Sequence, residues 1–120
     1  MNDIDCQISF VSGAVNRILS QIDCDVLSST LGCAHLAYWR DKTSGVADMR
    51  RQEVMLPLAF LYSRNYPAST WRGNKKLKDA IEALLYFWCK NQYPDGSMDE
   101  WYIGERAFAA AAFSMHAVTR

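Results

Sequence analysis

The feature that most constrains the fold is an apolar repeat at intervals of three and four in residues 77–88. The repeat consists of Leu77, Ala80, Ile81, Leu84, Leu85 and Trp88. This spacing is typical of an amphipathic helix, and Asn74 precedes it where an asparagine side chain can cap the helix N-terminus. Tyr86, Phe87 and Cys89 add apolar surface outside the repeat. The pattern predicts a helix from Asn74 onward whose second half is buried on nearly all sides.

Three other segments show helical patterns. Residues 8–22 and 47–64 each carry one apolar stripe, and residues 105–119 are rich in alanine with apolar side chains around most of the circumference. Pro57 predicts a kink in the second segment, because proline removes a backbone donor and clashes one turn back. Residues 23–45 lack sustained periodicity and are expected to be ordered but irregular. Since no alternating run typical of a strand occurs, the sequence predicts an all-α fold of antiparallel helical hairpins.

Length and charge limit the classes of function. At 120 residues the chain is expected to form one helical domain, residues 1–120. It has 13 basic and 13 acidic residues, so it lacks the basic excess typical of nucleic-acid binding. No apolar run is long enough to span a bilayer, and the acidic N-terminus is unlike a signal peptide. The sequence favours a cytoplasmic protein with neither a nucleic-acid nor a membrane partner.

The cysteines and histidines give no sign of a metal centre. The cysteines show no CxxC or zinc-finger spacing, and Cys89 is expected to pack on its helix as a small apolar thiol. Cys33 and His35 can face one ion, but two ligands do not make a tetrahedral zinc site. His116 is expected to be a packed or capping residue rather than a base. The sequence therefore predicts no metal and no cofactor.

Residues 90–106 hold more carboxylates and aromatic rings than a helix connection needs. A loop between antiparallel helices emerges at one end of the bundle, so we expect its side chains to gather there, with Glu105 and Arg106 beginning the next helix. The candidate ligand-binding residues are Asp95, Asp99, Glu100, Trp101, Tyr102, Glu105 and Arg106. An aromatic face suits the apolar face of a pyranose ring, carboxylates accept its hydroxyl groups, and a guanidinium pairs with an acidic substituent. This composition predicts a saccharide-binding rim.

Each rim residue also has a structural interpretation. Asp95 and Ser97 flank Gly96 in a strong turn signal and are expected to bond to nearby amides. The acidic residues that follow suit the positive end of a helix dipole, and the two adjacent aromatic residues can fill the core. On a helix Glu105 and Arg106 point about 100° apart, so each should find a partner other than its neighbour.

Residues 83–114, ALLYFWCKNQYPDGSMDEWYIGERAFAAAAFS, resemble the helical hairpins of alpha/alpha-toroid proteins. Among these they are most similar to the helical domain of heparinase II/III-like polysaccharide lyases. The resembling positions are Trp88, Gln92, Asp95-Gly96-Ser97, Asp99-Glu100, Glu105-Arg106, Tyr38-Trp39 and Gln52-Glu53. Terpene cyclases and prenyltransferases share a Gln…Asp-Gly-Ser-Trp turn, but Met98 stands here in place of the tryptophan. The catalytic Tyr, His and Asn of the lyases are not carried over to any position of this chain.

The resemblance implies an incomplete toroid, since a toroid closes with many more helices than the four predicted here. The chain is then the N-terminal piece of a larger toroid, or it completes its core by self-association, which the apolar circumference of residues 105–119 also favours. Two classes of function follow. One is part of a polysaccharide lyase or a glycoside hydrolase-like enzyme, in which a carboxylate pair does acid–base work. The other is a non-catalytic module that binds glycan or protein, and a terpene-cyclase-like or prenyltransferase-like fragment is a further alternative.

Overall fold

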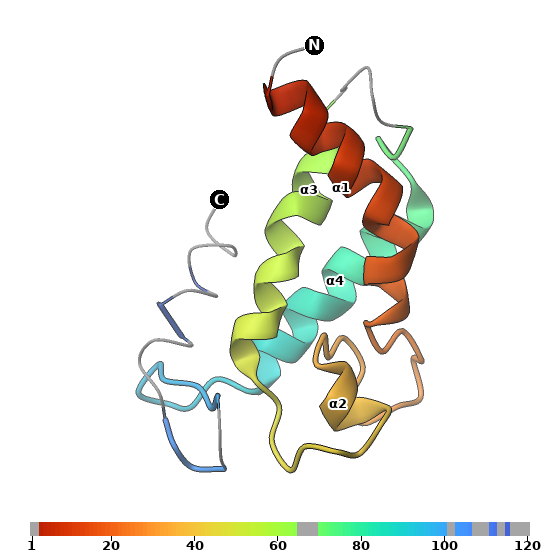
Figure 1. Ribbon diagram of the computed structural model, residues 1–120. Helices are drawn as coiled ribbons and strands as arrows, with labels where there is room; N and C mark the ends of the chain where they lie inside the picture. Colours follow the sequence, from red (N-terminus) through yellow and green to blue (C-terminus); the bar gives the residue numbers. More distant parts are fainter. Residues whose placement is uncertain (1–2, 65–69, 101–102, 107–110, 113–114, 116–120) are drawn as a thin grey trace.

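The computed structural model describes residues 3–64, 70–100, 103–106, 111–112 and 115. Within them α1 spans Asp3–Ser20, α2 Leu36–Trp39, the 3-10 helix η1 Met49–Val54, α3 Met55–Ser63 and α4 Lys75–Lys90, and no β-strand occurs. α3 packs against both α1 and α4 and runs antiparallel to α4 (Figure 1). The prediction of a helical fold is confirmed for the described residues. None of the described helices is both long and apolar enough to cross a membrane.

The core lies where α1, α3 and α4 meet, and each helix contributes the apolar stripe seen in its sequence. Val11, Ile18 and Leu19 pack against the core from α1 and are half-buried. The core itself consists of Val15, Ile22, Cys33, Ala34, Met49, Met55, Leu58, Leu61, Leu77, Ala80, Leu84, Phe87, Trp88, Met98 and Ala111. Asn74 caps α4 as predicted, since its side chain accepts a hydrogen bond from Leu77 N at 3.2 Å. The stripes therefore hold the helices together, and the cap fixes where α4 begins.

Pro57 lies in the first turn of α3 rather than at a kink within one long helix. The helix predicted over residues 47–64 consists of two pieces, η1 and then α3, which begins at Met55. A backbone N–H in the first turn of a helix has no intrahelical acceptor, so proline loses no hydrogen bond there. The 3-10 to α junction ahead of Pro57 takes the place of the predicted kink.

The second half of α4 is buried on one side, which corrects the prediction that it is buried nearly all round. Phe87 and Trp88 face the core, whereas 40% of Leu85 and 55% of Tyr86 are exposed. Cys89 is exposed as well, so it does not pack as a small apolar residue. α3 covers one face of α4, and no second layer in the described part of the chain covers the opposite face.

Glu105 and Arg106 do not begin a helix, so this part of the prediction is wrong. Both lie in irregular backbone, and Arg106 has a φ of 54°, in the left-handed region. Ala111, Ala112 and Met115 are helical. The rest of the helix predicted over 105–119, including His116, lies outside the described residues.

Gln52 ties the irregular segment 23–45 to the helices. This side chain is 1% exposed. Its Oε1 accepts from Ala34 N at 2.9 Å, and its Nε2 donates to Gly32 O at 3.1 Å and Leu84 O at 2.9 Å. Gly32 has a φ of +88°, and a Cβ added there would lie 1.7 Å from Ala83 O of α4. These contacts bring the backbone of residues 32–34 directly against η1 and α4.

Candidate functional site

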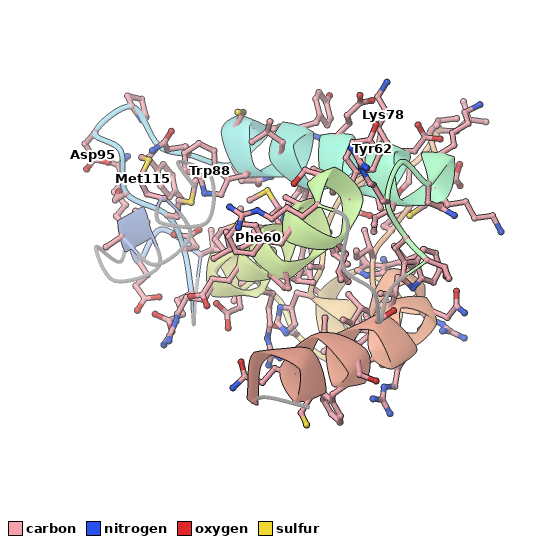
Figure 2. All side chains as sticks on the ribbon, turned by 90° about the horizontal axis from the view of Figure 1, so that it is seen from above. Phe60, Tyr62, Lys78, Trp88, Asp95 and Met115 are labelled. Carbon is pink, nitrogen blue, oxygen red and sulfur yellow. The ribbon has the colours of Figure 1, made fainter. Side chains whose placement is uncertain are left out.

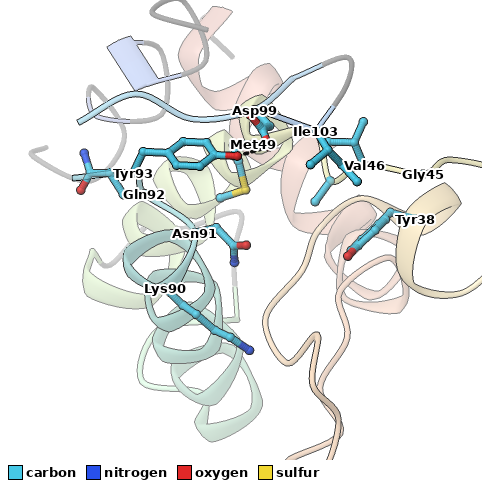
Figure 3. Close-up of a pocket in the computed structure, with 11 residues that line it drawn as sticks. Tyr38, Gly45, Val46, Met49, Lys90, Asn91, Gln92, Tyr93, Asp99 and Ile103 are labelled. Atoms are coloured by element: carbon cyan, nitrogen blue, oxygen red, sulfur yellow. Dashed lines mark hydrogen bonds between the residues drawn. The ribbon is translucent and has the colours of Figure 1, made fainter. Parts of the chain in front are cut away.

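A pocket of about 350 Å³ opens beside the C-terminal end of α4. Its walls come from two segments that are far apart in sequence, residues 38–49 and 90–103 (Figure 3). The lining residues are Tyr38, Gly45, Val46, Ala47, Met49, Lys90, Asn91, Gln92, Tyr93, Asp99 and Ile103. A hydrogen bond from Met49 N to Asp99 O, 3.1 Å long, joins the two walls. The pocket is the candidate site because it places two tyrosine rings among several polar side chains.

A tight turn begins the wall that follows α4. Gly96 N donates to Tyr93 O, and Tyr93 N donates to Ser97 O, each at 2.9 Å. Asp95 Oδ1 accepts from Ser97 N at 3.0 Å and from Ser97 Oγ at 2.6 Å, so the turn interpretation of Asp95 and Ser97 is confirmed. These two bonds hold the pKa of Asp95 below its ordinary value. Gln92 Nε2 donates to Gly96 O at 3.0 Å and fixes the turn to the end of α4.

Asp99 organises the next part of the loop. Its Oδ2 accepts from Tyr93 Oη at 2.8 Å and from Gly104 N at 3.2 Å, and its Oδ1 accepts from Arg106 N at 3.2 Å. Burial alone would raise the pKa of Asp99, but these hydrogen bonds outweigh it and the pKa is lowered. The same bond to Asp99 raises the pKa of Tyr93. Figure 3 shows the Tyr93 hydroxyl directed at Asp99, and the Arg106 guanidinium lies 4.6 Å from the centre of the Tyr93 ring.

The remaining charged groups of the loop bond to one another, to the backbone or to η1. Arg106 Nη1 lies 3.8 Å from Asp95 Oδ2, and Glu105 Oε1 accepts from Glu100 N at 3.1 Å. Glu105 and Arg106 thus bond to different groups, although the helical geometry on which that prediction rested is absent at these two residues. Glu100 Oε1 accepts from Arg50 Nη1 at 3.3 Å and links the loop to η1. The side chains of the Arg106–Asp95 pair are each 54% exposed, so this pair shapes the loop more than it stabilises the fold.

The opposite wall is held by His35, the residue before α2. His35 Nδ1 accepts from Asp48 N at 3.0 Å, which fixes the stretch that carries Val46 and Met49 into the pocket. Burial and the nearby Arg51 lower the pKa of His35. The described residues contain no group of three or more His, Cys, Asp or Glu able to hold a metal ion. His35 therefore serves the backbone of this wall.

The predicted ligand-binding residues surround the pocket more than they line it. Among those that the structure describes, Asp99 is the one in the wall. Asp95, Glu100, Glu105 and Arg106 lie in the same loop and bond to neighbouring groups. Figure 2 shows Asp95 beyond the C-terminal end of α4. Trp101 and Tyr102 lie outside the described residues. Contact between these side chains and a ligand stays a prediction.

Several pocket residues are missing from the sequence prediction: Tyr38, Lys90, Asn91, Gln92 and Tyr93. All but Tyr38 belong to segment 90–106, and their amide, amine and phenol groups were the signal that could have found them. Tyr38 carries no local signal, because its place in the pocket depends on how residues 38–49 fold against the loop.

Comparison with models of known protein families, with curated proteins and with solved structures finds no match to this chain. The site is therefore interpreted from its own chemistry.

Proposed function

We propose that the chain is a non-catalytic helical module that binds a short stretch of an acidic saccharide in the pocket between residues 38–49 and 90–103. The observation that carries the proposal is the combination of Tyr38 and Tyr93 with Asn91 and Gln92 in one open pocket. Tyrosine rings pack on the apolar face of a sugar, and amides exchange hydrogen bonds with its hydroxyl groups. The volume of about 350 Å³ lies near the lower end of the range of about 300–1,000 Å³ typical of ligand pockets, which suits a short ligand.

Lys90 and Asn91 keep hydrogen-bonding groups that a ligand can use. Lys90 Nζ donates to Ser29 O at 2.7 Å, and Asn91 Nδ2 donates to Phe87 O at 2.9 Å. An ammonium group has three donors, and an amide has two donors and one acceptor. These contacts use one donor on each side chain, so further donors and the Asn91 amide oxygen remain for a bound sugar. The Lys90 ammonium is the group that favours a carboxylate-bearing sugar over a neutral one.

The titration behaviour of Asp99 and Tyr93 argues against two particular catalytic roles. A general acid at neutral pH needs a raised carboxyl pKa, and a phenol that acts as a base needs a lowered one. The hydrogen bonds around Asp99 outweigh its burial and lower its pKa, so it stays ionised. The bond to Asp99 raises the pKa of Tyr93, so it stays a neutral phenol. Asp99 is therefore unsuited to be the general acid, and Tyr93 is unsuited to be the base, of a lyase or hydrolase.

We further propose that residues 83–114 form a hairpin of the heparinase II/III-like toroid type, which would meet the same class of ligand. In this interpretation the chain corresponds to part of a toroid array whose loops meet polysaccharide. The polar character of the pocket disfavours the apolar ligands of the terpene-cyclase and prenyltransferase alternative. Asp95 and Arg106 then act by shaping the loop that carries Tyr93 and Asp99.

Calorimetric titration with a uronate-containing trisaccharide and its neutral counterpart tests the proposal. Lys90→Gln should weaken the acidic ligand about threefold, as for an exposed charge pair, and leave the neutral ligand unchanged. Lys78→Gln is the matched control, since Lys78 lies near the other end of α4 (Figure 2). Tyr38→Leu should weaken both ligands about fivefold, because it removes one ring and keeps apolar bulk.

Two results contradict the proposal. One is the absence of binding heat for either saccharide with a wild-type protein whose circular dichroism is helical. The other is equal loss of affinity in Lys90→Gln and Lys78→Gln, since binding would then depend on general positive charge and not on the pocket.

A further inference from the structure

The loop between α1 and α2 is rigidly built around a buried carboxylate. Asp23 is 4% exposed, and its Oδ2 accepts from Ser28 Oγ and Thr30 Oγ1, each at 2.6 Å. Asp23 N donates to Cys33 O at 3.0 Å, and Gly32 N donates to Asp23 O at 2.7 Å. Side-chain and backbone bonds therefore close this loop at both of its ends.

This rigid loop presents two large apolar side chains to solvent. Val26 is 79% exposed and Leu27 is 91% exposed. Their backbone is fixed as well, because Leu27 N donates to Asp25 Oδ1 at 3.0 Å and Ser28 N donates to Asp25 O at 3.0 Å. Because the backbone that carries these side chains is already fixed, association would cost little backbone entropy here.

An apolar hollow of about 740 Å³ lies beside these anchors, between the end of α1, the loop and α4. Its apolar wall includes Leu19, Leu31, Ala80 and Tyr86, and Val26 also lines it. This surface is separate from the saccharide pocket, since the two share no lining residue. The exposed Leu27 side chain and the apolar hollow thus lie next to each other on one face of the molecule.

We propose that this face is a homodimer interface in which Leu27 of each copy enters the hollow of the other. A twofold interface brings the same patch of both subunits together, so it needs a surface that carries its own complement. Val26 lines the hollow, and Leu27 follows it directly in the sequence. A twofold axis that passes near Val26 therefore brings Leu27 of each copy close to the hollow of the other copy. The occupant is a second copy because anchor and hollow are both present on this one chain.

The charges around the hollow are self-complementary in the same way. Lys75 and Lys76 lie in the first turn of α4, and Asp79 and Glu82 lie one and two turns further on. In the proposed dimer this same axis also runs across α4 and places the two helices antiparallel, so that the basic end of one faces the acidic stretch of the other. Opposite charges at an interface favour the matched register and disfavour others.

Sedimentation equilibrium of the wild-type chain is expected to show a monomer–dimer equilibrium in the micromolar range. Leu27→Asp should raise the dimer dissociation constant by about tenfold or more, because it removes the apolar side chain that packs against the apolar wall of the hollow. The side chain is almost fully exposed in the monomer, so circular dichroism should be unchanged. Phe10→Asp is the matched control, since Phe10 is 73% exposed on α1 and does not line the hollow.

Charge reversal gives a second, independent measurement. Lys76→Glu should weaken the dimer, and adding Glu82→Lys in the same chain should restore part of the loss, because each copy then again carries both signs. A wild-type chain that stays monomeric to millimolar concentration overturns the proposal, as does a dimer that Leu27→Asp and Phe10→Asp affect equally. Lack of rescue by the double reversal overturns the antiparallel α4 register.

Discussion

Replacing Gly32 by alanine tests the close approach that fixes residues 32–34 against α4. The φ of +88° is strained for an alanine, at a cost of about 1–2 kcal/mol. The added Cβ would also lie 1.7 Å from Ala83 O and 2.4 Å from Ala83 C. Both are backbone atoms of α4, so they cannot rotate away as a side chain could. The segment must therefore move, and the bond from Gln52 Nε2 to Gly32 O must stretch or break, which costs about 1–3 kcal/mol more. We expect a total loss of about 2–5 kcal/mol.

Two other glycines separate these contributions. Gly73 has a φ of +72° with nothing within 4 Å of an added Cβ, so Gly73→Ala should lose about 1–2 kcal/mol from backbone strain alone. Gly13 lies inside α1 with open space around it, and Gly13→Ala should gain about 0.5–1 kcal/mol. Urea denaturation followed by circular dichroism measures all three. Equal losses for Gly32→Ala and Gly73→Ala would refute the close approach to α4.

The remaining predictions concern the buried amide, the histidine and the cysteines. Gln52→Leu should destabilise the fold by about 2–5 kcal/mol in urea denaturation, because it leaves buried backbone groups without their partner. Acidification should weaken the fold: the pKa of His35 is lowered from 6.5 in the folded chain, so the stability it contributes is present above pH 6.5 and is lost as pH falls. His35→Gln should remove this part of the pH dependence. Finally, burial raises the pKa of Cys33 to about 11, so Cys33 should resist a thiol reagent that modifies the exposed Cys89.

Each of these has an outcome that contradicts it. A loss below about 1 kcal/mol for Gln52→Leu would mean that water replaces the amide. If the dependence of the unfolding free energy on pH were the same in His35→Gln as in the wild type, other groups would cause the acid sensitivity. The direct check is the NMR signal of the Asp48 amide, which donates to His35 Nδ1 and should shift when His35 is protonated. Equal reaction rates of Cys33 and Cys89 in the folded chain would show that the core opens readily.

Features whose partners are close in sequence could be predicted. The Asn74 cap and the turn at Asp95 and Ser97 follow from residue types, because the atoms that bond lie within three residues of one another. The helical stripes were predictable for a similar reason, since a repeat of three and four specifies which face is buried. The kink predicted at Pro57 was wrong: the backbone changes from 3-10 to α at Met55, ahead of the proline, which lies in the first turn of α3.

Features that depend on distant contacts could not be predicted. Gln52 finds its partners 18 to 32 residues away, so nothing local distinguishes it from an exposed glutamine. The pocket likewise exists because Met49 bonds to Asp99, which brings Tyr38 opposite Tyr93. The exposed side of the second half of α4 was also missed, since residues 83–89 are all apolar and only the packing shows which face is left uncovered.

An NMR titration of the isotope-labelled protein with the uronate-containing trisaccharide tests the central claim most directly. If the pocket between residues 38–49 and 90–103 binds the sugar, the amides of Val46, Ala47, Asn91 and Gln92 should shift in a saturable way. Amides at Leu19 and Ala80, in the separate hollow, should stay in place. Saturable shifts confined to the hollow, or no shifts at millimolar saccharide, would contradict the proposal that this pocket is a saccharide-binding site.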